Sequence, residues 1–189
     1  MDTDITLAPG RACGSCTLCC KVMRIRELDK PPGEWCPHCA IGKGCKIYDS
    51  RPEDCRIFYC GYLIWDTLPD YWFPANSKIV VTSELGGDRL TFHVDPARPD
   101  AWRKEPFYSD IRRMSANRPH KLAQVLVRVD RNSTVIFPER EIELGYVSPD
   151  ERIITFEIMT PNGPAVDAVK VRADDPRLAG REVGKTYRD

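Results

Sequence analysis

Eight consecutive residues near the start of the chain hold four cysteines and decide the fold of the N-terminal region: Cys13-Gly14-Ser15-Cys16-Thr17-Leu18-Cys19-Cys20. A second batch of five cysteines follows the Pro31-Pro32-Gly33 turn, and its members are Cys36, Cys39, Cys45, Cys55 and Cys60. All nine cysteines therefore lie in residues 13–60, and none occurs in residues 61–189. This asymmetry predicts two units, a cysteine-rich domain over residues 1–75 and a second domain over residues 76–189.

The clustered thiols favour metal binding over disulfides. The chain has no apolar run long enough to cross a bilayer, and its first twenty residues lack the basic and apolar regions of a secretory signal. We therefore expect a cytoplasmic protein with no membrane partner. In a reducing cytosol, dense cysteines are typical of metal or redox sites. Nine thiols also cannot all pair in disulfides within one chain.

The overall composition is that of an ordinary globular protein, and its charge argues against one class of partner. The chain has 28 basic and 28 acidic residues, and 42% of its residues are hydrophobic. Nucleic-acid-binding proteins normally carry a basic surplus, so we expect no nucleic-acid partner. The sequence also lacks the P-loop, HExxH and GxSxG motifs, which gives no support to nucleotide-binding, zinc-protease or serine-hydrolase functions.

The spacing of the cysteines is compatible with two kinds of metal centre. The pairs Cys16-x2-Cys19 and Cys36-x2-Cys39, with sixteen residues between them, match the zinc-ribbon pattern. The run Cys13-x2-Cys16-x2-Cys19 equally matches the opening of the bacterial ferredoxin motif, although the final cysteine and proline of that motif are missing. The spacing alone therefore leaves iron-sulfur and zinc open.

The adjacent pair Cys19-Cys20 favours a centre with more than one metal atom, or two nearby sites. Neighbouring side chains diverge, so two adjacent cysteines seldom bind the same single ion. His38 is a weaker ligand candidate, because its position inside a Cys-x2-Cys turn more often holds an exposed residue or one that only supports the ligands. The motif of radical SAM enzymes is not completed, since Met23 stands at its third cysteine position.

A helix is predicted to begin near Arg51. The stretch Ser50-Arg51-Pro52-Glu53 has the form of a capping box with an early proline. We expect this helix to carry Cys55 and to continue towards Trp65. On a straight helix Cys55 and Cys60 would point about 140° apart. This geometry predicts that Cys60 lies outside the metal site.

The residue pattern of 76–189 predicts a mainly antiparallel β domain with one helix. Seven apolar and β-branched runs alternate with turn residues, and they are Ile79 to Thr82, Leu90 to Val94, Val125 to Val129, Val135 to Phe137, Ile142 to Tyr146, Ile153 to Met159 and Val169 to Val171. The helix is predicted to begin near Pro106 and to end before Pro119. We interpret His93 and His120 as structural. The predicted class is α+β: a small irregular cysteine-rich metal-binding domain with a short helix, followed by this β domain.

Two segments of the cysteine-rich unit carry the signature of a known family. One is Cys13-x2-Cys16-x2-Cys19-Cys20, and the other is Cys45-Lys46-Ile47-Tyr48-Asp49-Ser50-Arg51-Pro52-Glu53-Asp54-Cys55-Arg56-Ile57-Phe58, which is similar to the pattern C-x-I-Y-x-x-R-P-x-x-C-R-x-F. Together they resemble the YkgJ-like cysteine-cluster family, described as a zinc- or iron-chelating domain. The resemblance covers about a quarter of the chain. It implies a metal site and implies no particular reaction.

The resemblance and the spacing together name the candidate ligands. The cysteines expected to bind the cofactor are Cys13, Cys16, Cys19, Cys20, Cys45 and Cys55. The cysteines expected to bind metal are these six together with Cys36 and Cys39. Arg51 and Arg56 would offset the negative charge of the thiolates, and eight aromatic residues within 48–73 would form a dry shell around the centre or a packed core beneath it.

These observations predict a metal-binding protein that coordinates an iron-sulfur cluster for electron transfer or redox sensing. The alternative is a structural Zn²⁺ module that acts in protein interaction without catalysis. Activity as an iron-sulfur component of an oxidoreductase stays open, because no catalytic residue and no substrate can be named from the sequence. In either case we expect a protein redox or binding partner.

Overall fold

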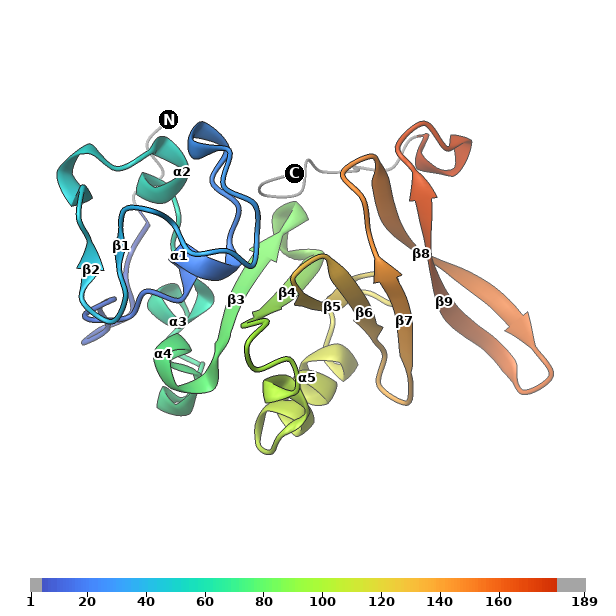
Figure 1. Cartoon of the computed structure of the whole chain (residues 1–189). Helices are drawn as coiled ribbons and strands as arrows, with labels where there is room; N and C mark the ends of the chain where they lie inside the picture. Colours follow the sequence, from blue (N-terminus) through green and yellow to red (C-terminus); the bar gives the residue numbers. More distant parts are fainter. Residues whose placement is uncertain (1–4, 180–189) are drawn as a thin grey trace.

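The cysteine-rich unit consists of short elements and loops, and the rest of the chain is built on strands. The structure is a computed structural model that describes residues 5–179. The N-terminal elements are α1 (Cys19–Val22), η1 (Arg26–Leu28), β1 (Cys39–Ala40), β2 (Gly44–Cys45), η2 (Tyr48–Ser50), α2 (Glu53–Arg56), α3 (Gly61–Ile64), η3 (Asp70–Trp72) and α4 (Pro74–Ser77). Figure 1 shows them gathered beside strand β3.

A five-stranded sheet forms the centre of the molecule. Its strands follow the order of the chain and are β3 (Ile79–Glu84), β4 (Arg89–Val94), β5 (Gln124–Val129), β6 (Asn132–Ile136) and β7 (Glu141–Tyr146). Two longer strands, β8 (Glu151–Thr160) and β9 (Gly163–Arg172), form a separate hairpin beside β7 (Figure 1). The remaining elements are helix α5 (Phe107–Ala116) and the 3-10 helices η4 (Leu85–Gly87), η5 (Ala101–Arg103) and η6 (Pro176–Leu178).

The sequence-based prediction of the second unit is confirmed in class and in its elements. Each of the seven predicted runs is a strand, and the predicted helix is α5 (Phe107–Ala116). The one parallel pair in the sheet is β4 with β5, and α5 lies in the connection between them. A parallel pair needs such a crossover, because a tight turn can join only antiparallel strands. The mixed α+β class, with mostly antiparallel pairing, is the observed one.

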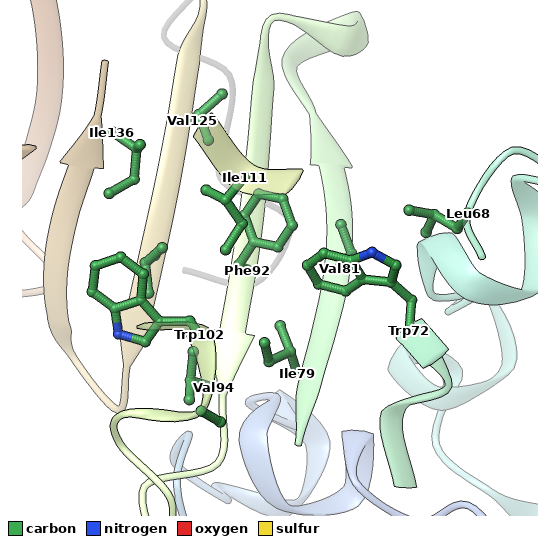
Figure 2. Close-up of a cluster of buried hydrophobic side chains, with 12 residues drawn as sticks. Leu68, Trp72, Ile79, Val81, Phe92, Val94, Trp102, Ile111, Val125 and Ile136 are labelled. Atoms are coloured by element: carbon green, nitrogen blue, oxygen red, sulfur yellow. The ribbon is translucent and has the colours of Figure 1, made fainter. Parts of the chain in front are cut away.

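One face of the sheet is apolar and carries the main hydrophobic core. Alternate residues of β3, β4 and β5 point to this face, where α5 covers them through Ile111. Trp72 and Trp102 pack on the same face, and Figure 2 shows both rings against the sheet residues. Trp72 Nε1 donates a 2.9 Å hydrogen bond to Asp110 of α5, which is itself buried. The core thus joins η3 of the cysteine-rich unit to the helix of the second unit.

The cysteine-rich unit also packs on the opposite face of the sheet. Val80 of β3 lies in a cluster with Leu18, Val22 and Leu63. In addition, Lys21 Nζ donates a 2.6 Å hydrogen bond to Asp95 at the end of β4. Apolar and ionic contacts therefore cross the predicted boundary between residues 75 and 76.

The long helix predicted from Arg51 to Trp65 is wrong. The chain forms two single-turn helices, α2 and α3, and its backbone is extended at Cys60 between them. Ser50 does not cap α2. Instead Glu27 of η1 accepts hydrogen bonds from the backbone N–H groups of Glu53 (2.6 Å) and Asp54 (3.2 Å). A carboxylate distant in sequence thus replaces the predicted capping box, and this tertiary contact overrides the local signal.

No helix within residues 5–179 is long and apolar enough to cross a bilayer.

Candidate metal centre

A single cavity of about 390 Å³ brings the two batches of cysteines together. Its lining includes all nine cysteines of the chain: Cys13, Cys16, Cys19, Cys20, Cys36, Cys39, Cys45, Cys55 and Cys60. None of them forms a disulfide, and all lie within the part of the chain that the structure describes. The eight cysteines predicted as metal ligands therefore line one cavity, together with Cys60.

The first batch of cysteines is held by a tight turn and the start of α1. Gly14 has a φ of +51°, which lets the chain reverse between Cys13 and Cys16. The turn is closed by a 2.8 Å hydrogen bond from the Cys16 N–H to the Cys13 carbonyl. Helix α1 then begins at Cys19 and places Cys20 one residue further on the same turn. This local geometry is the Cys-x2-Cys turn that the spacing predicts.

The second batch is attached to the first through the backbone. The Cys36 N–H donates a 3.0 Å hydrogen bond to the Cys20 carbonyl, and the Cys39 N–H donates one of 3.0 Å to the Cys36 carbonyl. Cys39 and Cys45 face each other across the β1–β2 hairpin. Directly opposite residues of a strand pair point to the same side. The hairpin therefore presents Cys39 and Cys45 together.

Cys60 lies at the site because the predicted helix is broken. The extended backbone between α2 and α3 lets both Cys55 and Cys60 line the cavity, which a straight helix would not allow. Cys60 is only 9% exposed and packs with Leu18 and Leu63. The geometric reason for excluding Cys60 from the site is therefore wrong.

The thiols are close enough to influence one another's ionisation. Burial raises the pKa of Cys60 to about 11, and Cys13 and Cys16 add to the increase because like charges repel. Burial likewise raises the pKa of Cys39 to about 11, with Cys20 as the next cause. A hydrogen bond with Cys19 is the main reason why the pKa of Cys20 is raised. Cys20 is thus a neighbour of thiols from both batches.

Cationic side chains lie around these thiols. Burial raises the pKa values of Cys13 and Cys16, and the hydrogen bond with Cys19 raises that of Cys20. A nearby cation opposes each increase without cancelling it: Arg51 at Cys13, Lys78 at Cys16 and the buried Lys30 at Cys20. Lys30 Nζ also donates hydrogen bonds to the carbonyls of Lys21 and Met23 at the end of α1. The predicted role of Arg51 as a charge partner fits this position. Lys30 and Lys78 were not predicted, because no local pattern marks them.

The predicted aromatic residues divide between the cavity and the core. Tyr48, Phe58, Tyr59, Tyr62 and Phe73 line the cavity. Trp65 and Trp72 belong instead to the hydrophobic core on the far face of the sheet. Aromatic and other apolar residues thus form part of the cavity wall, and Tyr48 lies at its exposed rim.

The histidines take different places. His38 lines the cavity, as its position between Cys36 and Cys39 requires. His93 Nε2 lies 3.0 Å from Thr82 Oγ1 on the sheet, and His120 Nε2 lies 3.0 Å from an Asp88 carboxylate oxygen. Neither of these two lines the cysteine cavity, in agreement with their interpretation as structural residues.

The donors at the cavity are mainly thiols. No group of three or more histidine, cysteine, aspartate or glutamate side chains in residues 5–179 converges closely enough to hold a single metal ion. The cysteines instead surround a volume of about 390 Å³. Soft thiolates are the ligands of iron-sulfur clusters and of zinc. By donor type, the residues present fit such a group.

Comparisons with protein-family models, with curated proteins and with solved structures gave no match.

Proposed function

We propose that residues 13–60 bind an iron-sulfur cluster, or a comparable multi-metal thiolate centre, and that the protein transfers electrons or senses redox state through it. The observation that carries the proposal is the meeting of nine cysteines at one cavity. One zinc ion or one [4Fe–4S] cluster takes four cysteine ligands. Nine thiols at one place exceed that number, which supports a multinuclear assembly or two neighbouring centres.

The size of the cavity supports the same proposal. A volume of about 390 Å³ is roughly thirty times the 10–15 Å³ that one water molecule requires by the same measure. A single four-coordinate ion needs no such space, because its ligands close directly around it. A cluster with inorganic sulfide fills more of it.

The protein supplies ligands, charge and a dry wall to this centre. Cys13, Cys16, Cys19, Cys20, Cys36, Cys39, Cys45 and Cys55 are the proposed ligands, with Cys60 as a further candidate. A bound cluster of this kind accepts and releases single electrons. Lys30, Lys78 and Arg51 stabilise the negative charge of thiolates beside them. The aromatic wall keeps the surroundings at low dielectric constant, which is one factor that sets a reduction potential.

Structural zinc binding is the second candidate, and one observation favours it. The turn from Cys36 to Cys39 leads directly into the β1–β2 hairpin, which presents Cys45 opposite Cys39. A Cys-x2-Cys turn on a small hairpin is the usual form of half a zinc-ribbon site. Under this reading the metal would hold residues 36–45 against α1, and the protein would act as an interaction module.

Metal analysis of anaerobically isolated full-length protein tests the proposal. We expect brown protein that contains iron and acid-labile sulfide in similar amounts. Colourless protein with stoichiometric zinc and no sulfide would replace the first candidate with the second. This measurement needs no binding partner, so its result concerns the metal centre alone.

Cysteine variants then assign the ligands. We expect Cys16→Ser and Cys55→Ser to lose most of the metal, whereas Ser15→Ala keeps it, because Ser15 is exposed and does not line the cavity. Cys60→Ser is the informative variant. The position of Cys60 beside Cys13 and Cys16 predicts a reduced metal content, and an unchanged content would exclude Cys60 from the ligand set.

A further inference from the structure

The second face of the five-stranded sheet carries many polar residues. Cross-strand partners place eight of them on this face, among the apolar Val80, Leu126 and Val135: Thr82, Glu84, Arg89, Thr91, His93, Gln124, Arg128 and Ser133. All of the eight except Arg128 are buried. Glu84 pairs with Arg89, His93 pairs with Arg128, and Arg128 pairs with Ser133 in register. The opposite face of the same strands holds the apolar core. A sheet covered on both sides normally has mainly apolar residues on both, so the number of buried polar residues on this face requires an explanation.

Four polar atoms on this face lack hydrogen-bond partners. In residues 5–179, the buried side-chain atoms without a partner are Glu84 Oε2, Thr91 Oγ1, Arg128 Nε and Ser133 Oγ. All four belong to the polar face, and three of them are donors. Buried polar groups are almost always paired in folded proteins, because leaving one unpaired is costly. Two of these residues, Glu84 and Arg128, line the same cleft, which points to a ligand there.

A cleft of about 90 Å³ opens onto this face, between the cysteine-rich unit and the chain that follows β7. Its floor includes Glu84, Arg89, His93 and Arg128. One wall is the cysteine-rich unit from Val22 to Arg24 together with Pro32, and the other wall is the chain from Val147 to Ile153. The volume accommodates roughly six to nine water molecules at about 10–15 Å³ each. A small ion or one end of a small molecule fits this space.

The cleft has a surplus of positive charge. Five arginines line it (Arg24, Arg89, Arg128, Arg131 and Arg152), against three carboxylates (Glu84, Asp130 and Glu151). Glu84 Oε2 lies 3.6 Å from Arg89 Nη1, so the Glu84 carboxylate is already paired with one of these arginines. Guanidinium groups bind carboxylates and phosphates with two parallel hydrogen bonds. The lining therefore favours an oxyanion.

We propose that this cleft is a binding site for a small molecule with an oxyanion end, either a carboxylate or a phosphate. Arg128 is the central residue, since its Nε is buried and makes no hydrogen bond. Thr91 and Ser133 lie near it on neighbouring strands, beneath the cleft and outside its lining.

The proposed anion site adjoins the cysteine cavity. Val80 lines the cysteine cavity, and its cross-strand partner His93 lines the cleft. Helix α1 joins them as well, since Cys19 and Cys20 line the cavity and Val22 lines the cleft. A molecule in the cleft is therefore a neighbour of the proposed centre. The anion site does not depend on that centre, because no cysteine lines the cleft.

Calorimetric titration of the full-length protein, with its metal content unchanged, tests the inference. Inorganic phosphate and malonate are titrated separately, at constant ionic strength set with chloride. We expect saturable one-site binding of at least one of them. Phosphate alone assigns a phosphate ligand, malonate alone assigns a carboxylate ligand, and both together assign a general oxyanion site. Heat no greater than that of the chloride control, for both anions, overturns the proposal.

Arginine variants locate the binding. Arg128→Gln should weaken it at least about tenfold, as expected for loss of a charged hydrogen-bond donor. Arg98→Gln removes the same charge from an exposed position outside the cleft and should leave the affinity unchanged. An equal loss in both variants would mean nonspecific charge attraction and would overturn the assignment.

Thermal unfolding separates a binding role of Arg128 from a structural one. For a ligand-binding arginine, Arg128→Gln without anion should unfold at the same temperature as the parent or higher, and the stabilisation by anion should be lost. Arg24→Gln, on the cleft wall, provides a second variant if Arg128→Gln does not fold. If Arg24→Gln binds the anion as well as the parent does and Arg128→Gln is destabilised, the arginines of the cleft serve only the fold.

Discussion

The ion pair between Lys21 and Asp95 should contribute measurably to the attachment of the cysteine-rich unit to the sheet. Lys21 belongs to α1, next to Cys20, and Asp95 follows β4. Their N–O distance is 2.6 Å, and the two side chains are only 12% and 11% exposed. At this distance the Coulomb attraction is about 6 kcal/mol for an effective dielectric constant of about 20. The lost hydration of both ions offsets most of it.

We expect a net coupling of about 2 kcal/mol from a double-mutant cycle with Lys21→Met and Asp95→Asn. Each single variant should cost about 2–4 kcal/mol, because it leaves the other partner buried without its counter-charge. After Lys21→Met, Asp95 keeps a 2.9 Å hydrogen bond from the Ala97 N–H, which moderates the loss. The double variant should therefore be more stable than the sum of the single effects implies.

Urea unfolding followed by tryptophan fluorescence measures these free energies, with all variants at the same metal content. The chain supplies a matched control in Lys121 and Glu157, whose N–O distance is also 2.6 Å but whose side chains are 62% and 48% exposed. The control cycle should give less than about 1 kcal/mol of coupling. Equal coupling in both cycles would refute the argument from burial, and no coupling at Lys21 would show that the ion pair does not fasten the units.

Two further predictions concern the contacts around the site. Arg11→Ala should lower the free energy of unfolding by about 2–4 kcal/mol. The reason is that Arg11 donates hydrogen bonds to the carbonyls of Tyr62 (2.8 Å) and Trp65 (2.7 Å) at α3. A loss below about 0.5 kcal/mol in chemical denaturation would contradict this expectation. Asp110→Ala should cost about 2–3 kcal/mol by orphaning the buried Nε1 of Trp72, and Asp110→Asn, which keeps an acceptor there, should cost clearly less in the same assay. Equal costs would show that the hydrogen bond to Trp72 is not the source.

The strands were predictable because their signal is local. Alternating apolar residues such as Ile79 and Val81 mark β3, and the turn residues around them set its limits. The break between α2 and α3 was not predictable in this way. The N-terminus of α2 is capped by Glu27, which is 26 residues away in sequence. A helix pattern cannot reveal a partner that only the tertiary fold supplies.

The candidate site shows the same division between local and distant information. The Cys-x2-Cys turns follow from spacing alone, since small residues such as Gly14 permit the reversal. That both batches meet at one cavity depends on the hydrogen bond from Cys36 to the Cys20 carbonyl and on the path of the chain through Cys60. The polar face around Arg128 had no sequence signal, because its residues come from four strands and gather only in the sheet.

X-ray absorption spectroscopy of the anaerobically isolated protein tests most directly whether the cysteines enclose a multi-metal thiolate centre. At the iron edge we predict a first shell of sulfur atoms at about 2.3 Å, similar to other metal–thiolate bonds, and a second shell from a neighbouring metal atom. A sulfur shell around zinc with no metal neighbour would contradict the cluster and leave structural zinc. A first shell of oxygen and nitrogen atoms alone would contradict thiolate ligation altogether.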